Sequence, residues 1–103
     1  MAGTELEAVR AELKGRIAAI GTRPASRLEL AREVDAIRAI AHRAGLHPAV
    51  TVAHLLDDAL ARGEHGPLVH AWLSVLSDAV ASERRDAAAC DTFAAACAVR
   101  FIG

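Results

Sequence analysis

Apolar residues recur along this chain at the three- and four-residue spacing of α-helices, and glycine or proline separates the periodic segments. In the first segment, residues 4–20, charged residues occupy the positions outside one narrow apolar stripe, so we expect an amphipathic helix. The pattern T-x-x-E formed by Thr4 and Glu7 is a capping box, which predicts that this helix begins at Thr4. Gly21 is expected to end it. The stripe consists of Leu6, Val9, Leu13, Ile17 and Ile20.

The second periodic segment starts with another capping box, formed by Ser26 and Glu29. We expect its helix to continue to Ala44 and to end at Gly45, because glycine adopts the left-handed conformation that closes a helix. The residues expected to face the core are Leu30, Val34, Ile37, Ala41 and Ala44, with Ile40 beside them.

The third and fourth helices should each begin with a proline, Pro48 and Pro67, because the missing N–H of proline needs no partner there. Gly63 is expected to end the third helix. Its predicted buried residues are Val52, Leu55, Leu56, Ala59 and Leu60. The fourth helix has a wider apolar face, which suits a central helix covered on more than one side. That face consists of Leu68, Val69, Trp72, Leu73, Val75, Leu76, Ala79 and Val80.

Residues 68–102 contain no glycine or proline, but the charged stretch "SERRD" interrupts their apolar pattern. Because Ser82 is a favourable N-cap with acidic residues in the following turn, we expect a new helix to start there. The alternative is one long helix. The last segment would place Cys90, Phe93, Ala94, Cys97 and Phe101 on one face. With no alternating strand pattern present, the sequence predicts an all-α protein, a compact bundle of four to five helices.

Length and composition are consistent with one helical domain over residues 1–103. Hydrophobic residues make up 53% of the chain, yet 25 of them are alanine, so helices must approach closely to form a core. Cys90 and Cys97 would lie about 10 Å apart along a helix, too far for a disulfide. Reduced cysteines, a charged N-terminus and no long apolar run lead us to expect a soluble cytoplasmic protein without membrane contact.

The stretch "IAHRAGLHPAV", residues 40–50, resembles the general helix-turn-helix pattern of DNA-binding proteins. The residues that should pack the second helix onto the first are, however, Thr51 and His54, and neither is apolar. Residues 46–103 also contain four arginines against seven acidic residues, and the whole chain has a net charge of −1. Because phosphate binding needs positive charge, nucleic acid is not an expected partner, and DNA binding is the disfavoured third hypothesis.

Four histidines lie between residues 47 and 70, and they raise the question of a catalytic or metal site. His54 and Asp58 are four residues apart and share one helix face, and His70 or His65 could join them only if two polar faces met. Because the apolar stripe lies roughly opposite, we expect His54 and Asp58 to face solvent. The chain has no H-E-x-x-H or paired Cys-x-x-Cys pattern, so no metal and no cofactor is expected.

These observations favour a small soluble regulatory or adaptor module over an enzyme. It would act by helix packing against another protein or a second copy, with a homodimer expected. The alanine-rich last helix carries the interface candidates Phe93, Cys97, Phe101 and Ile102. The alternative is a small enzyme or ligand-binding protein that uses His54, Asp58 and His70 in a cleft between helices, as weak catalytic candidates.

Overall fold

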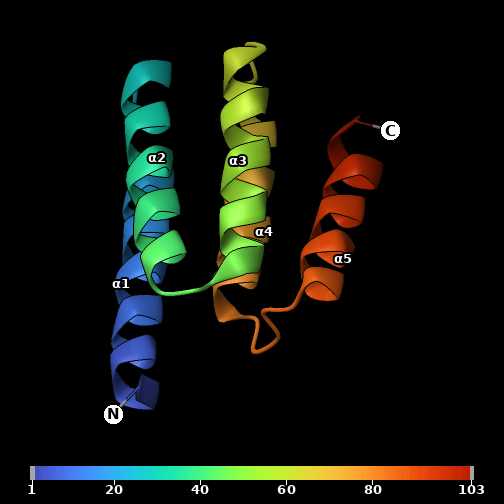
Figure 1. The fold of residues 1–103 in the computed structure, drawn as a ribbon. Coiled ribbons are helices and arrows are strands. Elements are labelled where there is room, and N and C mark those ends of the chain that lie inside the picture. Colours follow the sequence, from blue (N-terminus) through green and yellow to red (C-terminus); the bar gives the residue numbers. More distant parts are fainter. Residues whose placement is uncertain (1, 103) are drawn as a thin grey trace.

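The computed structural model describes residues 2–102 of the chain, with side chains described from residue 5 to residue 101. Its helices are α1 (Ala2–Thr22), α2 (Arg27–Arg43), α3 (His47–Ala61), α4 (Pro67–Ala81) and α5 (Ala87–Cys97), followed by the π-helical turn η1 (Ala98–Ile102). Residues 2–102 contain no strand. The predicted all-α bundle is therefore confirmed, as is the break between the last two helices (Figure 1).

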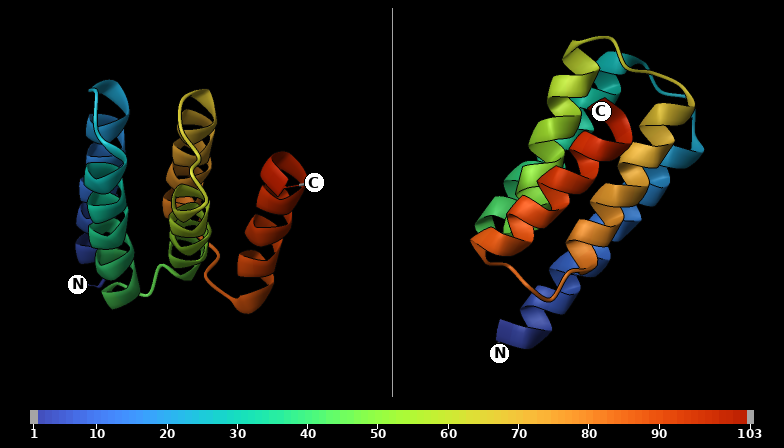
Figure 2. Two further views of the ribbon diagram at one scale, coloured as in Figure 1. Left: turned by 90° about the horizontal axis from the view of Figure 1, so that it is seen from above. Right: turned by 90° about the vertical axis from the view of Figure 1, so that its right-hand side faces the viewer.

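The helices form three layers, which the view from above in Figure 2 shows most clearly. The first layer is the antiparallel pair α1 and α2, the second is the antiparallel pair α3 and α4, and α5 alone makes the third. Packing between the layers joins α2 to α3, α1 to α4, and α5 mainly to α3. Residues with no solvent exposure at the centre of this core include Leu13, Val34, Ile37, Leu56 and Leu76.

The beginning of α1 differs from the prediction. The helix starts at Ala2, so Thr4 lies inside it and is not the N-cap residue. Glu7 is used differently as well, because its carboxylate accepts a hydrogen bond from Nη1 of Arg10 at 2.9 Å. A capping-box pattern does not fix a boundary when the residues before it, here alanine and glycine, can extend the helix by a turn.

The end of α1 also lies beyond its predicted position. Gly21 is helical, and the helix continues to Thr22, whose hydroxyl donates to the carbonyl of Ala19 at 3.2 Å. The residue that stops the helix is Pro24, because proline disfavours a helical conformation of the residue before it.

The predicted start of α2 is confirmed in detail. Oγ of Ser26 accepts from the backbone N–H of Glu29 at 3.1 Å, and the Glu29 carboxylate accepts from the N–H of Ser26 at 3.1 Å. Gly45 follows the end of α2 with φ 74°, as predicted. Helix α3 then begins at His47, so Pro48 is its second residue and not its first.

The core-facing stripes mostly match the expected residues. In α4 the wide apolar face is buried from Val69 to Val80, including Trp72, whereas Leu68 is 36% exposed. Leu55 in α3 and Ala44 after α2 are half-buried. Despite the apolar face of α4, no helix between residues 2 and 102 is long and apolar enough to cross a membrane.

The connection between α4 and α5 corrects the prediction for Ser82. Ser82 is extended, with ψ 130°, and ends α4 instead of starting α5. The reason lies in α1: Nε of Arg10 donates to the carbonyl of Val80 at 3.1 Å, and its Nη2 donates to that of Ser82 at 3.0 Å. Asp86 is the true N-cap of α5, since its carboxylate accepts from the N–H of Ala89 at 3.2 Å.

Candidate functional site

A cleft of about 340 Å³ opens at one end of the bundle, where the α1–α2 connection meets the α3–α4 turn. The antiparallel order of the helices brings these two connections together, because α1 and α3 end where α2 and α4 begin. Side chains from all four helices line the cleft. It therefore lies between the first and second layers and is open to solvent on one side.

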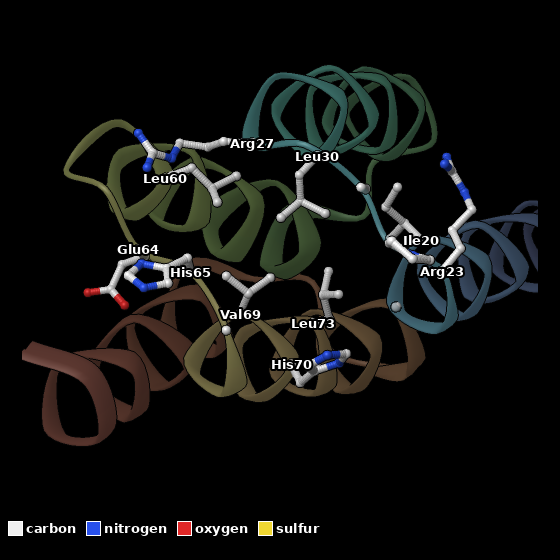
Figure 3. Close-up of a pocket in the computed structure, with 14 residues that line it drawn as sticks. Ile20, Arg23, Arg27, Leu30, Leu60, Glu64, His65, Val69, His70 and Leu73 are labelled. Carbon is white, nitrogen blue, oxygen red and sulfur yellow. The ribbon is translucent and has the colours of Figure 1, made fainter.

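The floor of the cleft is apolar. Figure 3 shows that its side chains converge on one space from four different helices. Each of them is at most 9% exposed. The floor consists of Ile20 from α1, Leu30 from α2, Leu60 from α3, and Val69 and Leu73 from α4. These residues belong to the hydrophobic core, and the cleft borders the edge of that core where the helices end.

The rim of the cleft carries charge, from Arg23, Arg27 and Glu64, together with two histidines. Nη1 of Arg23 lies 3.5 Å from the carboxylate of Glu29, in the α2 capping box. The backbone N–H of Ser26, followed by its hydroxyl, bonds this carboxylate and lowers the pKa of Glu29. Among the described residues, neither Arg27 nor Glu64 forms an ion pair; Arg27 is exposed and Glu64 is half-buried.

The histidines of the rim are His65 and His70. Nδ1 of His65 lies 3.0 Å from the carbonyl oxygen of Gly63, which fits an Nδ1–H donor and leaves Nε2 free as an acceptor. His70 was a candidate from the sequence, and it comes from the first turns of α4 beside the apolar floor (Figure 3).

The other two sequence candidates do not join His70. Nε2 of His54 lies 3.7 Å from Oδ2 of Asp58, with the two side chains 63% and 53% exposed. They form an isolated pair on the surface of α3, outside the cleft, as the phase of the apolar stripe predicted. Among the side chains described, those of residues 5–101, no three of His, Cys, Asp or Glu lie close enough together to hold a metal ion.

The candidate interface residues of the last helix face the interior. Cys97 has no solvent exposure, and this burial raises the pKa of its thiol. Phe101 stacks on Trp72 with ring centroids 4.2 Å apart, and Phe93 packs half-buried against the core. The side chain of Ile102 lies outside the described residues. A partner of α5 would therefore meet its opposite face.

A carboxylate pair between α2 and α3 was not expected from the sequence pattern. Asp35 and Asp57 share a hydrogen bond, and Arg38 lies beside both, at 3.3 Å from Oδ1 of Asp35 and 3.8 Å from Oδ2 of Asp57. Desolvation, followed by the bond to Asp35, raises the pKa of Asp57 to about 7. The same interaction lowers the pKa of Asp35, as expected for two neighbouring carboxyl groups that share one proton. Only the packing of the two helices could have indicated this pair.

The chain matches no protein-family model, and comparisons with curated proteins and with solved structures give no significant match. The chemistry of the cleft must therefore be inferred from its own residues. An apolar floor with a few polar side chains at the rim can hold a compact apolar group and orient a polar one.

Proposed function

We propose that this protein is a small ligand-binding module whose site is the cleft between the α1–α2 connection and the α3–α4 turn. The observation that carries this proposal is the floor, where five apolar side chains from four helices line about 340 Å³ of open space. Small-molecule sites are typically concave, mostly apolar, and roughly 300–1,000 Å³ in volume. This function belongs to the class that the sequence offered as its alternative, but its residues differ from the expected His54 and Asp58.

The energetics favour an apolar ligand of moderate affinity. Burying about 100 Å² of apolar surface, counted over the ligand and the cleft together, contributes about 2.5 kcal/mol. The loss of ligand freedom on binding offsets part of the total, so a small ligand would bind in the micromolar to millimolar range. Such an affinity suits a module that responds to the concentration of an abundant small molecule.

A neutral environment-sensitive dye tests this proposal directly. N-phenyl-1-naphthylamine should gain fluorescence on titration with the protein. The variant Ala25→Trp should lose the signal, because Ala25 is a half-buried residue of the α1–α2 connection that lines the cleft. Leu28→Trp is the matched control, since Leu28 is 61% exposed and lies outside the cleft. No fluorescence gain with the wild-type protein up to millimolar concentration would overturn the proposal.

A second candidate function is that of an adaptor that self-associates through the outer face of α5. Val99 is 81% exposed, the most exposed large apolar residue among those described. It continues a stripe of small residues, Ala88, Thr92 and Ala95, and the hydroxyl of Thr92 is already bonded to the carbonyl of Ala88 at 2.9 Å. Small side chains allow helices to approach closely, and α5 has no partner in its layer.

Sedimentation velocity distinguishes this candidate from the first. The protein should be a homodimer at high micromolar concentration, and Val99→Glu should be monomeric with unchanged helix content. Ala39→Glu, an equally exposed substitution on α2, is the control and should remain dimeric. A wild-type protein that stays monomeric would remove the adaptor function and leave the ligand-binding proposal untouched.

A further inference from the structure

We propose that the ligand of this cleft is an amphipathic anion, a compact apolar body with one carboxylate, held at the rim by Arg27. This inference rests on the proposed ligand-binding function and specifies its ligand class. It follows from the charges of the rim and from the position of Arg27 relative to the floor.

The rim has more positive than negative charge. Two of its side chains, Arg23 and Arg27, are cationic, and Glu64 is the only acidic residue lining the cleft. Arg23 already has a carboxylate partner, Glu29, at 3.5 Å. Arg27 has no ion pair among the described residues and is thus the cation available to a ligand.

The spacing along α2 places Arg27 on the same helix face as Leu30, at the edge of the floor. Arg27 is the first residue of the helix, and Leu30 follows three positions later, on the same face. Figure 3 shows the Arg27 side chain extending beside Leu60 of α3, at the edge of the apolar space. An apolar body that lies on Leu30 and Leu60 therefore brings its polar end to the guanidinium. The planar guanidinium matches a carboxylate, with which it can form two parallel hydrogen bonds.

Glu64 sets the selectivity against a larger negative charge. Glu64 lies in the α3–α4 turn, and its carboxylate is the group of the rim that would repel an anion. A ligand with a single carboxylate is repelled less by Glu64 than a ligand with two. The apolar body should be small, because the cleft has a volume of about 340 Å³. A ligand of about ten non-hydrogen atoms is expected to bind with a Kd on the order of 0.1–1 mM.

Three probes that share one alkyl chain test the charge preference: octanoate, 1-octanol and octylamine. Each is titrated to displace N-phenyl-1-naphthylamine from the wild-type protein. Octanoate should bind about fivefold more tightly than 1-octanol, the upper range for an ion pair at an exposed position, and octylamine should bind more weakly than either. Equal displacement by octanoate and 1-octanol, or preferred binding of octylamine, would overturn the inference while leaving the cleft a binding site. No dye binding at all would overturn the proposed function itself.

Variants locate the preference on Arg27. Arg27→Gln should bind octanoate and 1-octanol equally, with its affinity for 1-octanol unchanged. Arg32→Gln is the matched control, because Arg32 is an exposed arginine of the same helix outside the cleft. Glu64→Gln should bind octanoate about twofold more tightly, since it removes the opposing charge. Retention of the octanoate preference by Arg27→Gln would show that Arg27 does not hold the carboxylate and would overturn the inference.

Discussion

The turns that end α2 and α3 have the same backbone hydrogen bonds but different side chains after the glycine. At the end of α2, the N–H of Gly45 donates to the carbonyl of His42 at 3.1 Å, and that of Leu46 donates to Ala41 at 2.9 Å. This pair of bonds defines a Schellman motif, with the glycine at φ 74°. Leu46 is only 1% exposed and fills the end of the bundle.

At the end of α3, the N–H of Gly63 donates to Leu60 and the N–H of Glu64 donates to Ala59, both at 3.0 Å. The motif is the same, and the glycine again has a positive φ, 99°. The residue after it, however, is a charged glutamate that lines the cleft instead of filling it.

The difference shows that the backbone hydrogen bonds of a helix end do not decide whether the following turn packs into the core or lines a cleft. A Schellman motif is often accompanied by an apolar contact from the residue after the glycine. Leu46 is apolar and buried at this position, whereas Glu64 is only half-buried, because burying an unpaired carboxylate is costly. We infer that the polarity of this single position decides whether the turn joins the core or borders the cleft.

The largest expected effect is the difference in unfolding free energy between alanine variants of Leu46 and Glu64. Leu46→Ala should lower the free energy of unfolding by about 3 kcal/mol, because it leaves a cavity in the core where the Leu46 side chain is buried. Glu64→Ala should change it by less than about 0.5 kcal/mol, as for most surface substitutions. Urea unfolding followed by circular dichroism measures both. Similar losses for the two variants would show that the ends are packed alike.

Replacing Gly45 or Gly63 should have equal effects on stability if the two Schellman motifs are equivalent. Gly45→Ala and Gly63→Ala should each lower the free energy of unfolding by about 1 kcal/mol, because alanine resists a positive φ. Space is not the cause: a Cβ at Gly45 would lie 3.7 Å from the nearest heavy atom, and one at Gly63 would meet nothing within 4 Å. Gly15→Ala, within α1 and equally uncrowded, is the control and should instead raise the stability. A cost at only one turn would contradict the equivalence.

The sequence predicted helix ends where local chemistry decides them. Gly45 and Gly63 follow complete apolar stripes and do end helices, and Ser26 caps α2. Gly21 also follows an apolar stripe, but it stays helical. Glycine only permits a helix to end, whereas Pro24 disfavours a helical conformation of the residue before it. Ser82 failed as a cap because Arg10, which is distant in sequence, bonds the end of α4.

The candidate site was less predictable for a related reason. The apolar phase of α3 correctly placed His54 and Asp58 at the surface. The cleft, however, lies between two connections that are distant in sequence, and its rim residue Arg27 has no local pattern that marks it. The bond between Asp35 and Asp57 likewise depends on how α2 packs on α3.

The carboxylate pair of Asp35 and Asp57 predicts a pH dependence of stability. Because the pKa of Asp57 is raised to about 7, the folded protein holds its proton more tightly than the unfolded chain does. The stabilisation is complete below about pH 4 and is lost as the pH rises through about 7. By linkage a shift of this size corresponds to about 4 kcal/mol, and screening of the partly exposed carboxyl by solvent reduces the expected loss to about 1 kcal/mol.

The comparison of wild type with Asp57→Asn isolates this contribution from the histidines. Between pH 5 and 8 the stability of the wild type should fall relative to that of the variant, which lacks the ionisable group. The charged groups beside Asp57 are Asp35, Arg38 and Asp58, and all three remain in the variant. Parallel curves for the two proteins would mean that Asp57 titrates as it does in the unfolded chain.

The smallest expected effect on stability comes from a substitution that gives the turn after α3 an apolar residue, as in the turn after α2. Glu64→Leu places an apolar side chain after Gly63, where it can contact Ala59 as Leu46 contacts the corresponding position of α2. The gain in unfolding free energy should be about 0.5 kcal/mol, and binding of N-phenyl-1-naphthylamine should weaken severalfold because the leucine occupies the cleft. Glu64→Gln, similar in size but still polar, should retain the dye. If Glu64→Leu binds the dye as well as the wild type does, the connections themselves keep the cleft open, and the side chain after the glycine does not distinguish the two ends.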